Sequence, residues 1–269
     1  MKKLSNNFND TFLPERNSLS NLLNFIQNNE KSSLAEIKRE TGISNGTTTG
    51  KIKPFINYLY GMGLIFYEFT NGLYNFKLTE FGKIVFKEDP NLSMHITQWV
   101  CHANLCDLKS GSDVWISMFN DWKTNETRDI VSISKISKIS LKKYTPLLGM
   151  YINNGSFEYP KVIEDIKGRK VFKRNSAPLI LENIPGFGAV LIHLLANYCD
   201  KISQVSIPEF ESKTGFSNRF GWDSEERSTL YEKLANMGYI KISSLVVPRC
   251  IQSLISEKEA WLQMYSEIM

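Results

Sequence analysis

The sequence predicts a mainly α-helical fold in which two helix-turn-helix units are joined by a helical, basic middle region. Two observations lead there: one motif occurs twice, and many stretches space their apolar residues with the 3.6-residue period of helices. The composition, 42% hydrophobic and 22% charged over 269 residues, is that of a globular protein with a sizeable core. The expected boundaries are 1–88 for an N-terminal winged-helix domain, 89–183 for the middle region and 184–269 for a C-terminal winged-helix-like domain.

The repeated motif is the most informative feature of the chain. Residues 34–45 read LAEIKRETGISN and residues 207–218 read IPEFESKTGFSN, with five of the twelve positions identical. Residues 62–65 then match residues 237–240, at an offset of 175 instead of 173. Two matches in the same order at nearly the same spacing indicate that one folding unit is present twice.

Apolar spacing and helix breakers predict a helix, a turn and a second helix in the first copy. The first helix, over 34–40, ends before Gly42, because glycine favours the left-handed C-cap conformation. The second helix, over 50–61, contains Pro54. It tolerates this proline if it begins near Lys51, because first-turn N–H groups have no partner within a helix.

An opening helix over 18–28 precedes this pair, and a hairpin follows it. After Gly63 the apolar period changes to two, and strands over 64–69 and 73–78 flank an Asn-Gly turn. A further helix is expected over 78–86. Helix, turn, helix and hairpin in this order are typical of a winged helix.

The C-terminal copy predicts a similar order of elements. Helices are expected over 187–198, 208–214 and 223–237. A strand over 239–246 and a closing helix over 251–268 complete it.

The middle region is expected to be helical and basic. Residues 91–108 predict an apolar helix, and residues 131–141 repeat every three residues, which fits a helix, although a strand is also arguable. Residues 109–175 carry 13 basic and 7 acidic residues, whereas the whole chain has a net charge of +4. A basic centre suits contact with a polyanion, and an ordinary solvated surface explains it equally well.

Several classes of protein are excluded. Four cysteines in a chain of this length do not make a disulfide framework. The N-terminal residues lack the apolar segment of a secretion signal, and no apolar run approaches the roughly 18 residues of a membrane span. We therefore expect a soluble, cytoplasmic protein that does not contact a membrane.

The residues expected to contact double-stranded DNA lie at the start of the second helix, on the hairpin and in the basic middle region. Helix N-termini attract phosphate, and lysines and short hydroxyls contact the DNA backbone. The candidates are Ser44, Asn45, Thr47, Thr48, Thr49, Lys51, Lys53, Tyr74, Lys77, Lys142, Lys143, Arg169, Lys170, Lys173 and Arg174. In the C-terminal copy, the carboxylates within residues 223–226 repel phosphate, so a protein-docking role fits that copy better.

No pattern predicts a metal site, a cofactor or a catalytic centre. His95, Cys101, His102 and Cys106 are near one another in sequence, but their spacing matches no zinc motif. Adjacent helical residues also point about 100° apart, so Cys101 and His102 are poorly placed to share one ion. His102 is expected to hydrogen-bond inside the core. The chain lacks a nucleophile elbow and a complete phosphate-binding loop, so we expect no enzymatic activity.

Seven short motifs carry a resemblance to a known family. They are FNDTF at 8–12, GK at 50–51, GLI at 63–65, LTEFG at 78–82, DPNL at 89–92, TQWVCH at 97–102, and Trp115 leading to Phe119-Asn120. Together they resemble a prokaryotic family catalogued as domain of unknown function 4007, over about residues 8–198. The resemblance implies a companion of phosphorothioate DNA modification and other phage-defence genes, with other subunits of such a complex as partners.

Two functions follow from these observations. The first is a non-enzymatic DNA-binding subunit, or an accessory or regulatory subunit, of a bacterial DNA-modification system of the phosphorothioation type or of a phage-defence system. The second is a scaffold that docks a partner enzyme through its winged-helix surfaces and does not touch nucleic acid. No group of residues in the sequence points to a nuclease or another hydrolase.

Overall fold

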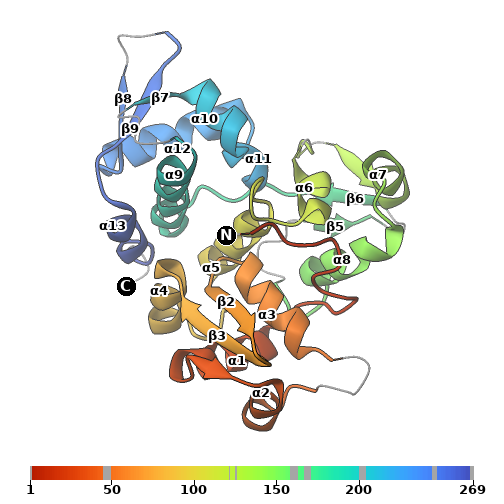
Figure 1. The fold of residues 1–269 in the computed structure, drawn as a ribbon. Coiled ribbons are helices and arrows are strands. Elements are labelled where there is room, and N and C mark those ends of the chain that lie inside the picture. The colour runs from red at the N-terminus through yellow and green to blue at the C-terminus, as the bar shows by residue number, and fades with distance from the viewer. Residues whose placement is uncertain are drawn as a thin grey trace.

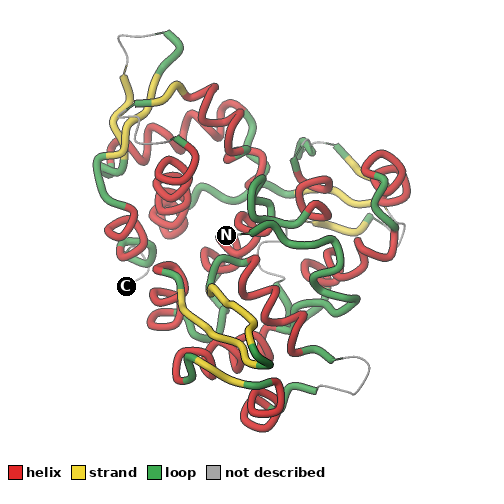
Figure 2. The backbone as a smooth tube through the Cα atoms, viewed as in Figure 1, coloured by secondary structure: helices red, strands yellow, loops and turns green. Residues whose placement is uncertain are grey.

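The computed structural model describes residues 2–44, 50–120, 122–124, 126–157, 163–166, 171–199, 204–243 and 247–266. It has three parts, arranged around the central helix α5 (His95–Leu105) in Figure 1: an N-terminal unit (residues 2–88), a middle region (89–183) and a C-terminal unit (184–266). Helices dominate, and the described residues also form three antiparallel sheets of three short strands each (Figure 2). The predicted helical character is therefore confirmed, within a mixed fold.

The N-terminal unit follows the predicted order, with one extra strand. Its elements are α1 (Arg16–Asn28), β1 (Lys31–Ser32), α2 (Leu34–Thr41), α3 (Ile52–Gly61), β2 (Ile65–Thr70), β3 (Leu73–Leu78) and α4 (Glu80–Glu88). The strand order is β1-β3-β2, which makes β2 an edge strand. Lys51 is the N-cap of α3, so Pro54 lies in the first turn, where its missing N–H costs no helical hydrogen bond.

The C-terminal unit has the same sheet topology and one additional short helix, α11. After a 3₁₀ turn (Leu181–Asn183) that ends the middle region, its elements are α9 (Ile184–Tyr198), β7 (Val205–Ser206), α10 (Ile207–Thr214), α11 (Phe216–Phe220), α12 (Ser224–Asn236), β8 (Ile240–Ser243), β9 (Cys250–Ser253) and α13 (Glu257–Leu262). The strand order β7-β9-β8 reproduces that of the N-terminal unit.

The predicted closing helix over 251–268 is wrong at its start and too long at its end, since α13 stops at Leu262 and residues 263–266 form turns. Residues 250–253 form β9, which pairs with both β7 and β8, and a helix begins only after the N-cap Ser256. The capping box between Ser256 and Glu259 fixes that start. The strand expected over 239–246 is β8, and residues 244–246 lie outside the described residues.

The duplication extends to individual hydrogen bonds in the turn after the repeated helix. Thr41 donates from Oγ1 to the carbonyl four residues earlier (2.6 Å) and accepts from the N–H two residues later (3.3 Å). Thr214 makes the same two bonds, at 2.7 and 3.2 Å. Gly42 and Gly215 then cap their helices with φ of 69° and 62°. The two copies therefore share a turn as well as a topology.

The middle region contains a small sheet that the sequence did not predict. Its elements are α5, α6 (Asp113–Phe119), β4 (Thr127–Asp129), α7 (Ile130–Ser137), a 3₁₀ turn (Leu141–Lys143), α8 (Tyr144–Ile152), β5 (Ile163–Asp165) and β6 (Val171–Arg174). The strand order is β4-β6-β5. Three- and four-residue strands are too short to show an alternating pattern, which explains why a purely helical region was expected. Residues 130–137 are helical, which resolves the ambiguity there.

Helix α5 joins the three parts. Nine of its eleven residues are buried, and it contacts α3, α9 and α11. The buried apolar side chains of all three parts form one continuous core from Leu4 to Tyr265. None of the helices in the described ranges combines the length and the apolar character that a membrane span requires.

Because the turn is duplicated, the same substitution in either copy should change the free energy of unfolding by a similar amount. Gly42→Ala and Gly215→Ala each place a Cβ on a residue with positive φ, where no atom lies closer than 3.5 Å. We expect each to lower the free energy of unfolding by about 1–2 kcal/mol, because the left-handed conformation is unfavourable for alanine. Urea unfolding measures this. A cost at only one of the two positions would contradict the equivalence of the turns.

Candidate functional site

The residues predicted to bind DNA at the start of α3 have different environments. Asn45, Thr47, Thr48 and Thr49 lie outside the described residues. Ser44 is exposed, and its carbonyl accepts a hydrogen bond from the N–H of Lys51 (3.1 Å). The ammonium of Lys51 forms an ion pair with Glu15, the N-cap of α1. Lys53 is exposed and forms no ion pair with any described residue. Of the two lysines, only Lys53 presents an uncompensated charge.

Helix α3 does not present a free face for a DNA groove, because the N-terminal segment covers it. Asn57 donates from Nδ2 to the carbonyl of Phe8 (2.7 Å), and the hydroxyl of Tyr58 donates to the carbonyl of Phe12 (3.0 Å). The hydroxyl of Tyr67 donates to Asn57 Oδ1 (2.6 Å), and only 8% of Asn57 is exposed. A recognition helix must project into the major groove, and this one is recessed.

On the hairpin, Tyr74 and Lys77 differ in accessibility. Tyr74 is 4% exposed, and its ring stacks against Phe76 with the centroids 5.7 Å apart. The expectation that Tyr74 reaches a DNA groove is therefore wrong: its ring fills the hydrophobic side of the hairpin. Lys77 lies on the other face and is exposed.

The basic residues of the middle region also divide into two groups. Lys142 and Lys173 are exposed and Lys143 is half-buried, so their contact with DNA stays a prediction. Arg169 and Lys170 lie outside the described residues.

Arg174 is the clearest correction, since only 1% of it is exposed. Its guanidinium donates to the carbonyls of Phe119 (2.9 Å), Trp122 (2.8 Å), Arg219 (2.7 Å) and Asn218. These carbonyls lie at or near the C-terminal ends of α6 and α11, where a cation is favoured. Burial lowers the pKa of Arg174 to about 10, which leaves it charged at neutral pH. Arg174 holds the core together and does not contact DNA.

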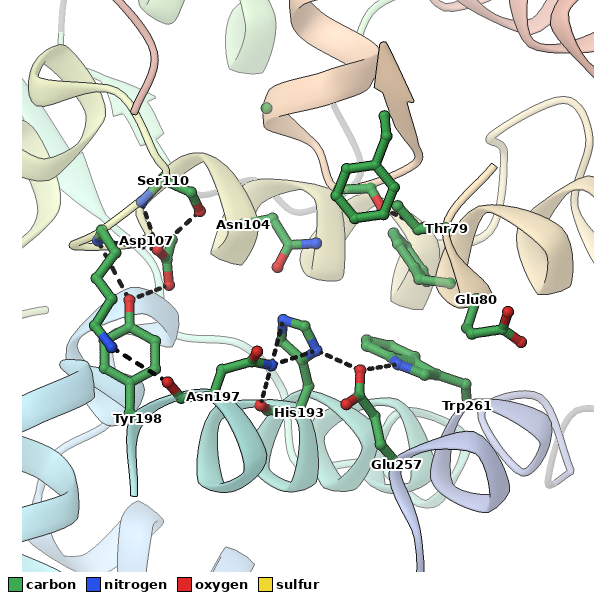
Figure 3. Close-up of a pocket in the computed structure, with 15 residues that line it drawn as sticks. Thr79, Glu80, Asn104, Asp107, Ser110, His193, Asn197, Tyr198, Glu257 and Trp261 are labelled. Atoms are coloured by element: carbon green, nitrogen blue, oxygen red, sulfur yellow. Dashed lines mark hydrogen bonds and ion pairs between the residues drawn. The ribbon is translucent and has the colours of Figure 1, made fainter. Parts of the chain in front are cut away.

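A cleft of about 330 Å³ lies between the two units, with walls from α4, α9 and α13 and from the end of α5 (Figure 3). The rings of Phe81 and Trp261 pack 4.9 Å apart where α4 meets α13. His193 Nδ1 lies 2.7 Å from Glu257 Oε1, which also accepts a hydrogen bond from Trp261 (3.3 Å). Burial is the largest single influence on Glu257 and opposes its ionisation, but the hydrogen bond and charge of His193 and the hydrogen bond from Trp261 together lower the pKa of the carboxyl.

Among the residues that the structure describes, no hydroxyl or thiol is hydrogen-bonded to the ring of His193. The cleft contains the hydroxyls of Thr79 and Ser110, which donate to the carbonyl of Gly63 (2.6 Å) and to Asp107 (2.9 Å). Neither hydroxyl is hydrogen-bonded to His193, so the nucleophile–base contact of covalent catalysis is not formed there. Across the described ranges, no group of three or more His, Cys, Asp or Glu side chains could hold a metal ion.

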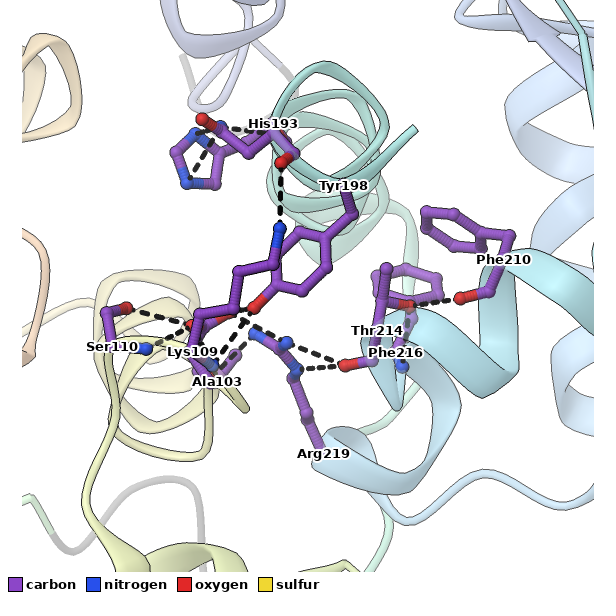
Figure 4. Close-up of polar contacts among 11 residues, drawn as sticks. Ala103, Lys109, Ser110, His193, Tyr198, Phe210, Thr214, Phe216 and Arg219 are labelled. Atoms are coloured by element: carbon purple, nitrogen blue, oxygen red, sulfur yellow. Dashed lines mark hydrogen bonds and ion pairs between the residues drawn. The ribbon is translucent and has the colours of Figure 1, made fainter. Parts of the chain in front are cut away.

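Asp107, at the other end of the cleft (Figure 3), is the centre of a buried polar network, whose partners Tyr198, Ser110 and Arg219 are labelled in Figure 4. Its Oδ2 accepts from Arg219 Nη2 (2.9 Å) and from the hydroxyl of Tyr198 (2.7 Å), and its Oδ1 accepts from the N–H groups of Lys109 (3.0 Å) and Ser110 (2.8 Å). Burial alone would raise the pKa of Asp107. The charge of Arg219 and these hydrogen bonds lower it to about 2. Arg219 also donates to the carbonyl of Thr214 (2.6 Å), in the duplicated turn.

His102 has the structural role that the sequence predicts. It is fully buried, with Nδ1 2.6 Å from the hydroxyl of Tyr151 and Nε2 2.8 Å from the carbonyl of Arg219. Burial, and then the positive charge of Arg174, lower the pKa of His102 to about 3, so the ring is neutral at physiological pH. It links α5 to α8 and α11 within the core.

Comparisons with known proteins identify the fold. No protein-family model matches the sequence, and no curated protein matches it. A crystal structure of magnesium-bound SspB has a TM-score of 0.75 at 13% sequence identity, and a second SspB crystal structure has a TM-score of 0.73 at 12% identity. Each comparison covers 97% of this chain and 87% of the other. The chain is therefore similar in fold to SspB over almost its whole length.

The depressed pKa of Asp107 predicts a dependence of stability on pH. Because the folded-state pKa of about 2 lies below the unfolded value of about 3.9, ionised Asp107 stabilises the fold above pH 4. This contribution, about 2–3 kcal/mol, is lost as the pH falls from about 5 to about 2. Urea unfolding from pH 7 to pH 3 measures it. Asp107→Asn should flatten the profile, whereas Asp113→Asn, at a surface ion pair, should leave it unchanged.

The buried guanidinium gives a second test. Arg174→Met leaves several buried carbonyls without donors, so the free energy of unfolding should fall by at least about 3 kcal/mol. Lys173→Met, one residue away and exposed, should change it by less than about 0.5 kcal/mol. Chemical denaturation compares the two. Equal effects would show that Arg174 does not hold the core.

Proposed function

We propose that this chain is a non-enzymatic DNA-binding or accessory subunit of a bacterial DNA-modification or phage-defence system of the phosphorothioation type. The observation that carries the proposal is the duplicated unit with sheet orders β1-β3-β2 and β7-β9-β8. We interpret both copies as winged helices, which are common in proteins that assemble on DNA. The fold shared with SspB and the motifs that resemble domain of unknown function 4007 support the same conclusion.

The DNA contact in this proposal comes from lysines outside the core. Lys53, Lys77, Lys142 and Lys173 are exposed and form no ion pair with any described residue. Exposed, uncompensated lysines release counterions from DNA when they contact its phosphates. Such contacts provide affinity and orientation without reading base sequence.

The C-terminal unit favours a protein partner. Asp223 and Glu226 form a capping box at the start of α12, and these carboxylates repel phosphate. The same unit exposes large apolar side chains, at Val247, Leu254 and Leu262. Exposed apolar residues are typical of surfaces that bind other proteins. This observation favours the alternative function, a docking scaffold, for the C-terminal unit, and the two roles are compatible in one subunit.

Binding of duplex DNA should weaken steeply with salt. Lys53→Glu combined with Lys77→Glu should lower the affinity at low salt and reduce the slope of log K against log[salt] by about 1 for each lost contact. Fluorescence anisotropy with a labelled duplex, measured between low and physiological salt, provides both quantities. Lys241→Glu, an exposed lysine of β8, is the matched control and should retain wild-type affinity.

Three outcomes would contradict parts of this proposal. Duplex binding that is absent or independent of salt would remove the DNA contact. Co-purification of partner subunits that survives nuclease treatment, without any DNA binding, would leave only the scaffold. Breakage of plasmid DNA by the pure protein with Mg²⁺ would contradict the non-enzymatic part, and Mg²⁺ is the appropriate ion because one SspB structure contains it.

A further inference from the structure

A groove of about 980 Å³ runs along the free edge of β2 and adjoins the cleft between the units at Phe66, which lines both. Its walls are the N-terminal segment, strand β2 and one side of α3. Lys53, Asn57 and Tyr60 line it from α3, and their spacing of four and three residues places them on one side of that helix. The groove therefore lies beside the helix face that the N-terminal segment covers.

Aromatic rings line much of this groove. Phe66 and Phe69, on β2, are 43% and 54% exposed. Three residues apart on a strand, they lie on opposite faces, so the groove wraps around the strand edge. Tyr60 and Tyr67 complete the lining, with their centroids 5.5 Å apart in an edge-to-face arrangement. Two phenylalanines this exposed on one short strand mark a binding surface.

The charge of the groove is positive. It is lined by Lys2, Lys3 and Lys53 and by one carboxylate, Glu68. Lys3 forms an ion pair with Asp113 (2.5 Å), whereas Lys2 and Lys53 form no ion pair with any described residue. The groove therefore combines uncompensated positive charge with accessible aromatic rings, which are the two properties of surfaces that bind single-stranded nucleic acid.

The recessed surface of the groove favours single-stranded DNA over a duplex. Its floor includes Asn57, which is nearly buried and engaged with Phe8 and Tyr67. A duplex is read by elements that project into its grooves, and this recessed surface cannot do so. Unstacked bases, in contrast, can enter a recess and stack on aromatic side chains.

We propose that this groove binds single-stranded DNA, with bases stacked on Phe66 and Phe69 and phosphates held by Lys2 and Lys53. The inference rests on the proposed function, because it specifies the form of DNA that the N-terminal unit holds. A peptide strand is the alternative ligand for the exposed edge of β2, and the groove favours DNA over it. A peptide would pair with the edge through backbone hydrogen bonds and would not require the two lysines.

The test is fluorescence anisotropy of the full chain with a labelled oligothymidine of about 12 nucleotides, within the range of known single-strand site sizes. We expect Phe66→Ala and Phe69→Ala each to weaken binding by roughly tenfold, from loss of base stacking. Lys53→Ala should weaken binding and reduce its salt dependence. Leu262→Ala and Lys241→Ala remove an exposed apolar side chain and an exposed charge from the C-terminal unit, and should have no effect.

A further variant distinguishes the loss of base stacking on Phe69 from a loss of stability of the hairpin. Phe69 packs against Tyr74, with centroids 4.6 Å apart, so its removal could disturb the hairpin. Phe69→Leu retains apolar bulk but loses the ring. Weakened binding by Phe69→Leu, at an unchanged melting temperature, would support stacking. Wild-type affinity in Phe66→Ala and in both Phe69 variants would overturn the proposal.

A duplex of matched length, measured in parallel, separates this inference from the proposed function. Duplex binding without single-strand binding would overturn the groove proposal alone. Single-strand binding without duplex binding would support the groove and remove only the duplex contact. Tighter binding of an RNA oligomer of the same length would overturn the assignment to DNA, and an absence of all nucleic-acid binding would overturn both.

Discussion

The ion pair between Asp107 and Arg219 is the interaction on which the arrangement of the two units depends. Two charges removed from water are costly unless each is paired and its remaining hydrogen-bonding groups are satisfied. Here Asp107 also accepts from Tyr198, Lys109 and Ser110, and Arg219 also donates to backbone carbonyls. Because Asp107 follows α5 and Arg219 lies in α11, the pair fixes the central helix to the C-terminal unit. Asp107 also lines the cleft between the units, so the pair lies at one end of that cleft.

The two copies have kept one framework and acquired different surfaces. Both retain the threonine-glycine turn and the same strand order. The N-terminal copy carries a groove with lysines and phenylalanines beside α3. The C-terminal copy begins α12 with carboxylates and exposes leucines. The proposed division of roles, with nucleic acid at one copy and protein at the other, therefore rests on these surfaces and not on the shared framework.

The sequence predicted those features that depend on neighbouring residues. The glycine after the repeated helix, the hairpin with its Asn-Gly turn and the late start of α3 all follow from local rules on caps, turns and proline. The sequence did not predict features that depend on contacts between residues far apart in the chain. A basic run gave no indication that Arg174 is buried against carbonyls of α6 and α11, and the partners Asp107 and Arg219 are 112 residues apart. The groove was missed because its walls come from three separate segments, although the lysines and phenylalanines themselves were visible.

The single interior shared by all three parts has a consequence for how the chain evolved. A duplicated module normally keeps its own interior, so that each copy can be lost, moved or joined to another gene. Here α5 is buried by both copies, and the apolar cluster continues from one to the other. Loss of either half would expose apolar surface that the other half now covers, which disfavours inheritance of one half alone.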